Sequence, residues 1–154
     1  MHETKKNYSY LKILIKKLKK TKRNQIPIAA CVTDGNNIIG YGQNKSLLDH
    51  AEIIAIKKTL KTTSLKNPIL YTSLEPCLMC VGATINAGIK IIYYGCRSPE
   101  SGIHTKHNYG LLKDITIIPL LKYEEACKEL LQEFFKYKRD KEVFFKKIIK
   151  KNND

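Results

Sequence analysis

Apolar and polar residues follow two different periods along the first part of the chain. Among the lysines of residues 8–20, apolar residues recur at helical spacing, which predicts an amphipathic helix that covers one face of a sheet. Residues 28–32 form a short apolar run that ends in a polar turn, and residues 38–41 resume it. These two runs predict the strands of a hairpin.

The middle of the chain alternates in the same way. Near-helical apolar spacing predicts a helix over residues 50–60, and β-branched and aromatic residues predict a strand over residues 69–72. Pro76 suits the first turn of a second helix, which we expect to reach about Ala87 and to end at Gly88.

The last third adds two strands and a long helix. Apolar runs predict strands over residues 91–94 and 115–118, and the Pro-, Gly-, Ser- and Asn-containing residues 98–108 predict a surface loop. Residues 123–150 are apolar on one face and densely charged elsewhere, which predicts a basic C-terminal helix or helix pair. Helices and strands thus alternate through one α/β layer structure.

Length and composition set the domain count and the compartment. A chain of 154 residues with 43% hydrophobic content suits one packed domain. No apolar run approaches the roughly 20 residues that span a bilayer, and the first residues are too polar to begin a secretory signal. We therefore expect a single domain over residues 1–154, no membrane association and a cytoplasmic location.

The net charge of +14 makes a polyanionic partner plausible, because basic clusters occupy residues 16–23 and 136–151. Lysine-rich coding from an AT-rich genome, with the charges on solvated faces, is the alternative explanation. Five cysteines form an odd set in a chain without an export signal, which favours metal binding over disulfides.

Two short motifs carry the chemistry. The first is His50-Ala51-Glu52, and the second is Pro76-Cys77-Leu78-Met79-Cys80. Each opens a predicted helix, so both sulfurs of the Cys-x-x-Cys pair face one side and a histidine from the other helix start completes three ligands. This mixed N and S set suits one Zn²⁺, with a fourth position left for water. Zinc lowers the pKa of such a water from 15.7 to about 7.

Glu52 follows His50 by two positions and is poorly placed to bind the same ion, but it can reach the bound water and carry protons. Hydrolytic deamination needs such a shuttle, since water loses a proton, a ring nitrogen gains one and the amine leaves as ammonia. The order His-x-Glu followed by Pro-Cys-x-x-Cys is a known signature of zinc nucleobase deaminases.

Other interpretations of these residues stay open. The histidine and acid are also compatible with ordinary capping or core roles, and the cysteines with small buried hydrophobes. A structural zinc site would need a fourth ligand, for which the candidates are Cys31, Cys96, Cys127, His104 and His107. We interpret the two candidate histidines as surface or substrate-loop residues.

From Ile26 to about Arg139, the chain resembles the bacterial tRNA adenosine deaminase family of the cytidine-deaminase superfamily. The landmarks that carry the resemblance are Ile26-Pro27-Ile28-Ala29-Ala30, Gly42-Gln43-Asn44, Leu74-Glu75-Pro76-Cys77-Leu78-Met79-Cys80, Gly82-Ala83, Tyr94-Gly95-Cys96-Arg97 and Phe134-Phe135-Lys136-Tyr137-Lys138-Arg139. Two departures are a short segment, Lys45 to Asp49, before His50, and Ser98 where the family usually has aspartate.

The resemblance implies a three-layer cytidine-deaminase-like fold, with a central five-stranded mixed sheet flanked by helices and zinc ligands at two helix N-termini. Residues 1–24 would form a basic amphipathic helix, residues 25–121 the zinc-binding deaminase core and residues 122–154 the basic C-terminal helix. The implied residue roles are zinc ligands at His50, Cys77 and Cys80, the proton shuttle at Glu52, and substrate contacts at Asn44, the Ala51 backbone N–H, Ile26 and Leu74.

The implied reaction is hydrolysis of adenosine to inosine at the wobble position of a tRNA anticodon stem-loop. Hydroxide activated by one zinc per subunit would attack C6 of the splayed base. The implied assembly is a homodimer, and basic residues near the C-terminus would hold loop phosphates. The alternatives are a deaminase of a free base or nucleoside, of guanine or cytosine type, and a non-catalytic zinc-bearing RNA-binding subunit.

Overall fold

One five-stranded sheet forms the centre of the chain, which the computed structural model describes over residues 4–61, 66–106 and 109–152. Its strands are β1 (Ala29–Thr33), β2 (Ile38–Gln43), β3 (Ile69–Leu74), β4 (Ile91–Cys96) and β5 (Thr116–Pro119). Their spatial order is β2-β1-β3-β4-β5. β1 runs antiparallel to β2 and β3, whereas β3, β4 and β5 are parallel. The predicted five-stranded mixed sheet is confirmed.

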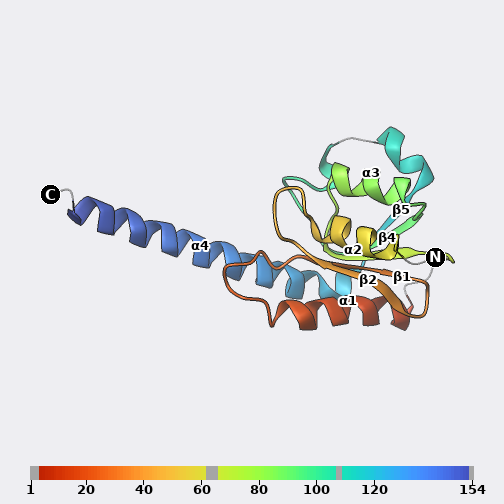
Figure 1. Ribbon diagram of the computed structural model, residues 1–154, viewed down its shortest axis with the longest axis horizontal. Helices are drawn as coiled ribbons and strands as arrows, with labels where there is room; N and C mark the ends of the chain where they lie inside the picture. The colour runs from red at the N-terminus through yellow and green to blue at the C-terminus, as the bar shows by residue number, and fades with distance from the viewer. Residues whose placement is uncertain (1–3, 62–65, 107–108, 153–154) are drawn as a thin grey trace.

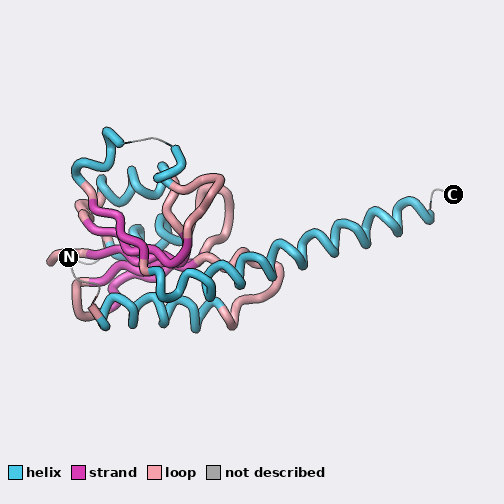
Figure 2. The backbone as a smooth tube through the Cα atoms, turned by 180° about the vertical axis from the view of Figure 1, so that it is seen from behind, coloured by secondary structure: helices cyan, strands magenta, loops and turns pink. Residues whose placement is uncertain are grey.

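Helices cover both faces of the sheet, as Figures 1 and 2 show. One face packs against α1 (Lys5–Leu18) and the first half of α4 (Glu124–Asn152), and the other packs against α2 (Ala51–Thr59) and α3 (Leu78–Asn86). Short 3-10 helices span Ile103–Lys106, Tyr109–Asp114 and Leu121–Tyr123. The three-layer arrangement predicted from the family resemblance is confirmed.

Alternation along β3 explains why there are two separate cores. Tyr71 points into the layer of α1, where it stacks on Tyr93 with ring centroids 5.2 Å apart. Leu70 points the other way, into the cluster formed with α2 and α3. Side chains of successive strand residues face opposite sides of a sheet, so a strand buried on both faces reads as continuously apolar.

Two glycines in β2 let α2 lie directly on the sheet. A Cβ at Gly40 would collide with the Ala55 carbonyl oxygen, and a Cβ at Gly42 would collide with the Ala51 carbonyl oxygen. The backbone of α2 therefore approaches the strand more closely than any side chain would permit. Since His50 immediately precedes this helix, the same contact sets the position of the histidine.

The structure differs from the sequence expectations at Pro76 and within residues 98–108, and it decides between the two alternatives predicted for the C-terminal segment. Pro76 precedes the N-cap Cys77 instead of occupying the first helical turn, so the N-terminal end of α3, with its partial positive charge, begins at the cysteine motif. The expected surface loop of residues 98–108 contains a 3-10 turn at Ile103–Lys106, while His107 lies outside the described residues. The C-terminal segment is one continuous helix of 29 residues, not a helix pair.

Candidate metal centre

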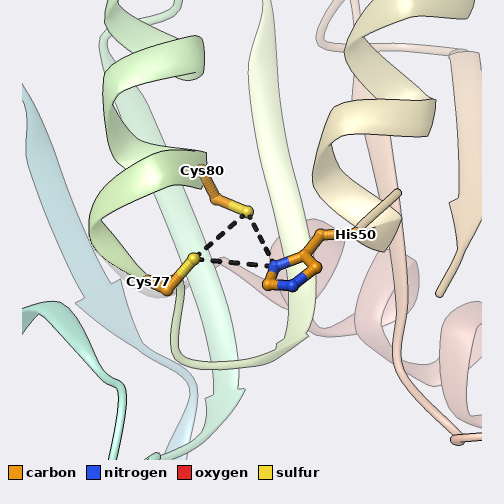
Figure 3. A group of neighbouring side chains, drawn as sticks. All are labelled: His50, Cys77 and Cys80. Carbon is orange, nitrogen blue, oxygen red and sulfur yellow. Dashed lines mark hydrogen bonds between the residues drawn. The ribbon is translucent and has the colours of Figure 1, made fainter. Parts of the chain in front are cut away.

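Three side chains from two helix starts converge at one end of the sheet, as Figure 3 shows. His50 is the N-cap of α2 and Cys77 is the N-cap of α3, while Cys80 is the third residue of α3. The two sulfurs lie 3.7 Å apart, and His50 Nδ1 lies 3.6 Å from Cys77 Sγ and 3.4 Å from Cys80 Sγ. Helix starts bring motifs that are distant in sequence to one point.

These separations fit a tetrahedral zinc ion. Zn–S bonds of about 2.3 Å and Zn–N bonds of about 2.05 Å at tetrahedral angles require roughly 3.8 Å between sulfurs and roughly 3.6 Å between sulfur and nitrogen. The observed distances agree with both values to within about 0.2 Å. The donor set of two thiols and one imidazole is also one that zinc prefers.

No fourth protein ligand joins this group within the described residues, where His50, Cys77 and Cys80 are the only such cluster of histidine, cysteine and acidic side chains. Cys31, Cys96 and Cys127 are buried in the core on the α1 face of the sheet. His104 instead contacts Glu75. Three ligands leave one tetrahedral position open, which is the arrangement of a catalytic zinc site and not of a structural one.

The pKa values of the Cys77 and Cys80 thiols shift in opposite directions. A hydrogen bond from the Cys80 thiol, with help from the Cys80 backbone N–H and His50, lowers the pKa of Cys77 to about 5. The same sulfur–sulfur hydrogen bond and burial raise the pKa of Cys80. A lowered pKa favours the thiolate form of Cys77, and a metal cation that binds both sulfurs replaces the proton of the second thiol.

Glu52 lies beside this cluster in a dry environment. Its side chain is 4% exposed, and Thr72 from β3 donates a hydrogen bond to Oε1 at 3.1 Å. Burial, and secondarily the charge of Cys77, raises the pKa of Glu52 above its ordinary range, although the hydrogen bond from Thr72 lowers it. A carboxyl group with a raised pKa is suited to accept and return protons near neutral pH.

An open pocket of about 650 Å³ surrounds these groups. Ile26, Asn44 and Leu74, all predicted substrate contacts, line it together with His50, Glu52 and Cys77. Ala51 is absent from the lining because it is fully buried, and its backbone N–H donates to Asn44 Oδ1 at 3.3 Å. Three of the four predicted substrate contacts, Ile26, Asn44 and Leu74, therefore lie in the pocket beside the metal cluster. The fourth, the Ala51 backbone N–H, is hydrogen-bonded to Asn44.

Sequence reasoning did not find the role of Glu75. This carboxylate is 4% exposed and accepts hydrogen bonds from the backbone N–H groups of Ser98 and His104, both at 3.0 Å, and from His104 Nδ1 at 2.8 Å. A Cβ at Gly102 would collide with it. Glu75 thus fixes the segment after β4 beside the pocket, which Ser101 of that segment lines.

Thr72 and the lining from α4 were also not identified as site residues. Thr72 lies on the same face of β3 as Leu70, and it is the polar residue of that face. A single polar residue among apolar ones at every second position is the sequence feature that could have identified Thr72. Leu131, Phe134 and Phe135 of α4 also line the pocket. Their contribution depends on where a distant helix packs, which periodicity does not reveal.

Comparisons with known proteins also indicate a zinc-binding deaminase. The profile of the cytidine and deoxycytidylate deaminase zinc-binding region matches residues 4–96. The tRNA-specific adenosine deaminase of Buchnera aphidicola subsp. Baizongia pistaciae is 33% identical over 151 residues, covering 90% of this chain and 93% of that protein.

Two of the solved structures that resemble this chain are a tRNA deaminase and a guanine deaminase. A tRNA:A34 deaminase that edits A to I at the wobble position is 25% identical with a TM-score of 0.64, covering 77% of this chain and 94% of its own. A guanine deaminase from Nitrosomonas europaea is 26% identical with a TM-score of 0.63, covering 84% of this chain and 82% of its own. Among the described helices, none is long and apolar enough to cross a membrane.

Proposed function

This chain belongs to the zinc-binding cytidine and deoxycytidylate deaminase family and, within it, to the tRNA-specific adenosine deaminases, and we propose that it converts adenosine to inosine at the wobble position of tRNA. The observation that carries the proposal is the buried Glu52 beside the cluster of His50, Cys77 and Cys80, with Glu52, His50 and Cys77 in the lining of one pocket. Its cofactor is zinc, one ion per subunit, with those three side chains as ligands.

The protein supplies proton transfer and alignment. Zinc, when bound, lowers the pKa of a water molecule to about 7 and so makes a nucleophile available at neutral pH. Glu52 accepts a proton from the nucleophile, delivers one to the purine ring nitrogen and assists the departure of ammonia. Thr72 holds the carboxylate in place through its hydrogen bond to Oε1.

Substrate contacts follow the lining of the pocket. Ile26 and Leu74 provide apolar walls for a flat base, and Asn44 offers an amide that can pair with a purine edge. The Ala51 N–H is the fourth contact, and it becomes available when the Asn44 side chain turns from it toward the substrate. Binding of the base thus exchanges an internal hydrogen bond for two contacts to the ligand.

The polyanionic substrate accounts for the charge of the chain. Within a single domain over residues 1–154, the core of residues 25–121 binds zinc and the base, while the basic segments of residues 1–24 and 122–154, which contain α1 and α4, bind phosphates of the anticodon stem-loop. We assign the enzyme to the cytoplasm, where its tRNA substrate is found, and to a homodimer, the assembly expected from the family resemblance.

A second candidate is deamination of free guanine, which the structural likeness to the guanine deaminase favours. That activity requires the same zinc site and a closed pocket for a small molecule, but no basic helix. The exposed lysines and arginine of α4 are unexplained by a free base, which supports the RNA substrate.

The test is inosine formation by purified, zinc-loaded protein on a tRNA with adenosine at the wobble position, alongside free adenosine, cytosine and guanine. We expect inosine in the tRNA at that position only. Turnover of guanine alone would replace the RNA assignment with the second candidate and leave the zinc chemistry in place.

A further inference from the structure

Glu75 is a second buried carboxylate of the site, and the proposed reaction gives it no step. It is 4% exposed, lines the pocket beside the metal cluster and stands two residues before Cys77. A buried charge is costly unless hydrogen bonds replace its lost hydration. Its partners therefore identify the part of the chain that this carboxylate holds in place.

The hydrogen-bond partners of the Glu75 side chain lie in residues 98–104, which we call the post-β4 segment. The backbone N–H of Ser98 donates to Oε2, and the backbone N–H of His104 donates to Oε1, both at 3.0 Å. His104 Nδ1 donates to the same Oε1 at 2.8 Å. A carboxylate only accepts hydrogen bonds, so the imidazole carries a proton on Nδ1. The two ends of the segment thus meet at one carboxylate.

The post-β4 segment also contacts the residue that follows Glu75. The backbone N–H of Ile103 donates to the Pro76 carbonyl oxygen at 3.0 Å, and the Ile103 side chain is fully buried in the core on the α2 and α3 face. Pro76 immediately precedes Cys77, the N-cap of α3. The dipeptide Glu75-Pro76 therefore has four hydrogen bonds to the segment. The position of the adjoining Cys77 depends on them.

The same network reaches the wall of the pocket. The hydroxyl oxygens of Ser98 and Ser101 lie 2.9 Å apart, and Ser101 lines the pocket. Gly102 permits the close approach of the segment, because a Cβ there would collide with the carboxyl group of Glu75. The post-β4 segment thus connects the cysteine motif with a surface that faces the substrate.

His104 contributes the side-chain donor of this network, whereas the other contacts to the Glu75-Pro76 dipeptide come from the backbone. Its imidazole is 42% exposed, and its ring lies near that of the buried Tyr94 in β4, with centroids 6.2 Å apart. A substitution at this exposed position removes one hydrogen bond without opening a cavity in the core. The role of His104 can therefore be tested in a folded protein.

We propose that His104 is a positioning residue, which fixes the post-β4 segment on Glu75 and so holds the zinc ligand Cys77 and the pocket wall at Ser101 as one rigid unit. Loss of a hydrogen-bonded group behind a metal ligand commonly lowers metal affinity or activity by about 10- to 100-fold. The inference deepens the proposed function. Its kinetic readout rests on that function, whereas its zinc readout needs no substrate.

The first arm of the experiment measures zinc release. It compares the wild type with His104→Leu, which removes the donor, and with His104→Asn, which keeps a side-chain N–H near the position of Nδ1. The matched control is Glu100→Gln, because Glu100 is exposed in the same segment and is not a hydrogen-bond partner of Glu75. With excess chromogenic chelator, we expect His104→Leu to release zinc about tenfold faster than the wild type. His104→Asn and the control should release it within about threefold of the wild-type rate.

The second arm measures steady-state kinetics on a wobble-adenosine anticodon stem-loop, normalised to bound zinc. We expect His104→Leu to raise KM about tenfold, because a loosened wall must be ordered when the substrate binds. Its kcat should stay within about twofold of the wild type, since Thr72 still holds Glu52. His104→Asn should restore the wild-type KM.

The outcomes separate a positioning role from a merely structural one. A lower Tm in His104→Leu, with wild-type zinc release and KM below the unfolding transition, would overturn the inference. Failure of His104→Asn to restore both values would also overturn it, as would a change in one value without the other. If the wild type forms no inosine in any RNA, the proposed function fails, and zinc release alone decides the role of His104.

Discussion

At the scale of single residues, Glu52 is the group whose surroundings most clearly serve a reaction. Its carboxyl group is buried, has a raised pKa and is held by Thr72 next to the metal cluster. A buried ionisable group destabilises a fold unless its lost hydration is compensated, and the neutral hydrogen bond from Thr72 compensates that loss only in part. Such a cost is expected where a carboxyl group must change its protonation during turnover.

Glu52→Gln should abolish this proton transfer while preserving the shape of the site, because the amide is isosteric and can still accept the hydrogen bond from Thr72. We expect kcat on the stem-loop to fall at least a hundredfold. Zinc content by metal analysis and stem-loop affinity by fluorescence anisotropy should stay at wild-type values. A variant that retains more than a tenth of the wild-type kcat would remove Glu52 from the catalytic role.

The five cysteines divide into two chemical classes. Burial raises the pKa of Cys31, Cys96 and Cys127 to about 12, which makes these thiols unreactive at neutral pH, whereas Cys77 is half-buried with a lowered pKa. Bound zinc would mask the reactive sulfur.

We therefore expect iodoacetamide at pH 7.5 to leave the zinc-loaded protein largely unmodified and to alkylate Cys77 first after zinc is removed with a chelator. Peptide mass spectrometry measures both. The His50→Ala variant is the matched test of the ligand set, since it should be alkylated without chelation. Equal labelling with and without zinc would contradict the assignment of Cys77 as a ligand.

At the scale of elements, the metal cluster depends on how closely α2 packs on β2. Gly42 permits this approach, because a Cβ there would collide with the Ala51 carbonyl oxygen, one residue after His50. The contact fixes the helix whose first turn carries both the histidine and Glu52. Gly82 in α3, by contrast, has nothing within 4 Å of the position of an added Cβ.

Gly42→Ala should lower the free energy of unfolding by about 1–3 kcal/mol through overpacking and should also weaken zinc binding, because α2 must move away from the strand. Gly82→Ala, the control, should raise that free energy by about 0.5–1 kcal/mol, since alanine is the better helix former. Urea unfolding and zinc competition titrations measure the two effects. Wild-type zinc affinity in Gly42→Ala would mean that the close approach does not position the site.

Most elements followed from the sequence because their apolar periods are unambiguous. The strand at Ile69–Leu74 and the helix at Ala51–Thr59 were predicted within a few residues. The end of the long helix was harder, because apolar and charged residues continue through it without a Gly or Pro that would separate one helix from two. The position of Pro76 was misjudged because proline suits both the first turn and the residue before the cap.

The metal cluster was also accessible from the sequence, since its ligand types and spacing admit few other uses. What was not accessible is what depends on tertiary packing. In the sequence, Glu75 is only a neighbour of the cysteine motif. Nothing nearby in the sequence indicates that its carboxylate oxygens accept hydrogen bonds from the backbone N–H groups of Ser98 and His104. A second pocket, between α4 and the segment that follows α1, likewise exists only because these two segments pack near one another.

At the scale of the whole molecule, the most unusual feature is the outer half of α4, which projects from the layered body (Figure 2). Described side chains from residue 138 to residue 150 are all exposed. This half carries both lysines and large apolar residues, among them Phe144 at 61% and Ile149 at 60% exposure. Exposed apolar groups in such number commonly mark a surface that meets a partner.

Truncation after Asp140 distinguishes what the outer half of α4 does. It removes residues 141–154, with five lysines and two acidic residues, and leaves the lining of the pocket beside the metal cluster complete. Because the side chains of residues 141–150 are all exposed, we expect the free energy of unfolding to change by less than about 0.5 kcal/mol. The loss of cations should raise KM for full-length tRNA several-fold and make that KM less dependent on salt concentration. KM for a stem-loop too short to reach the outer half of α4 should change little. Thermal unfolding at several protein concentrations and steady-state kinetics on the two substrates measure these effects. A large, concentration-dependent drop in Tm would instead show that a second copy of the chain covers the apolar face, and equal KM values for both substrates would exclude the outer half from RNA binding.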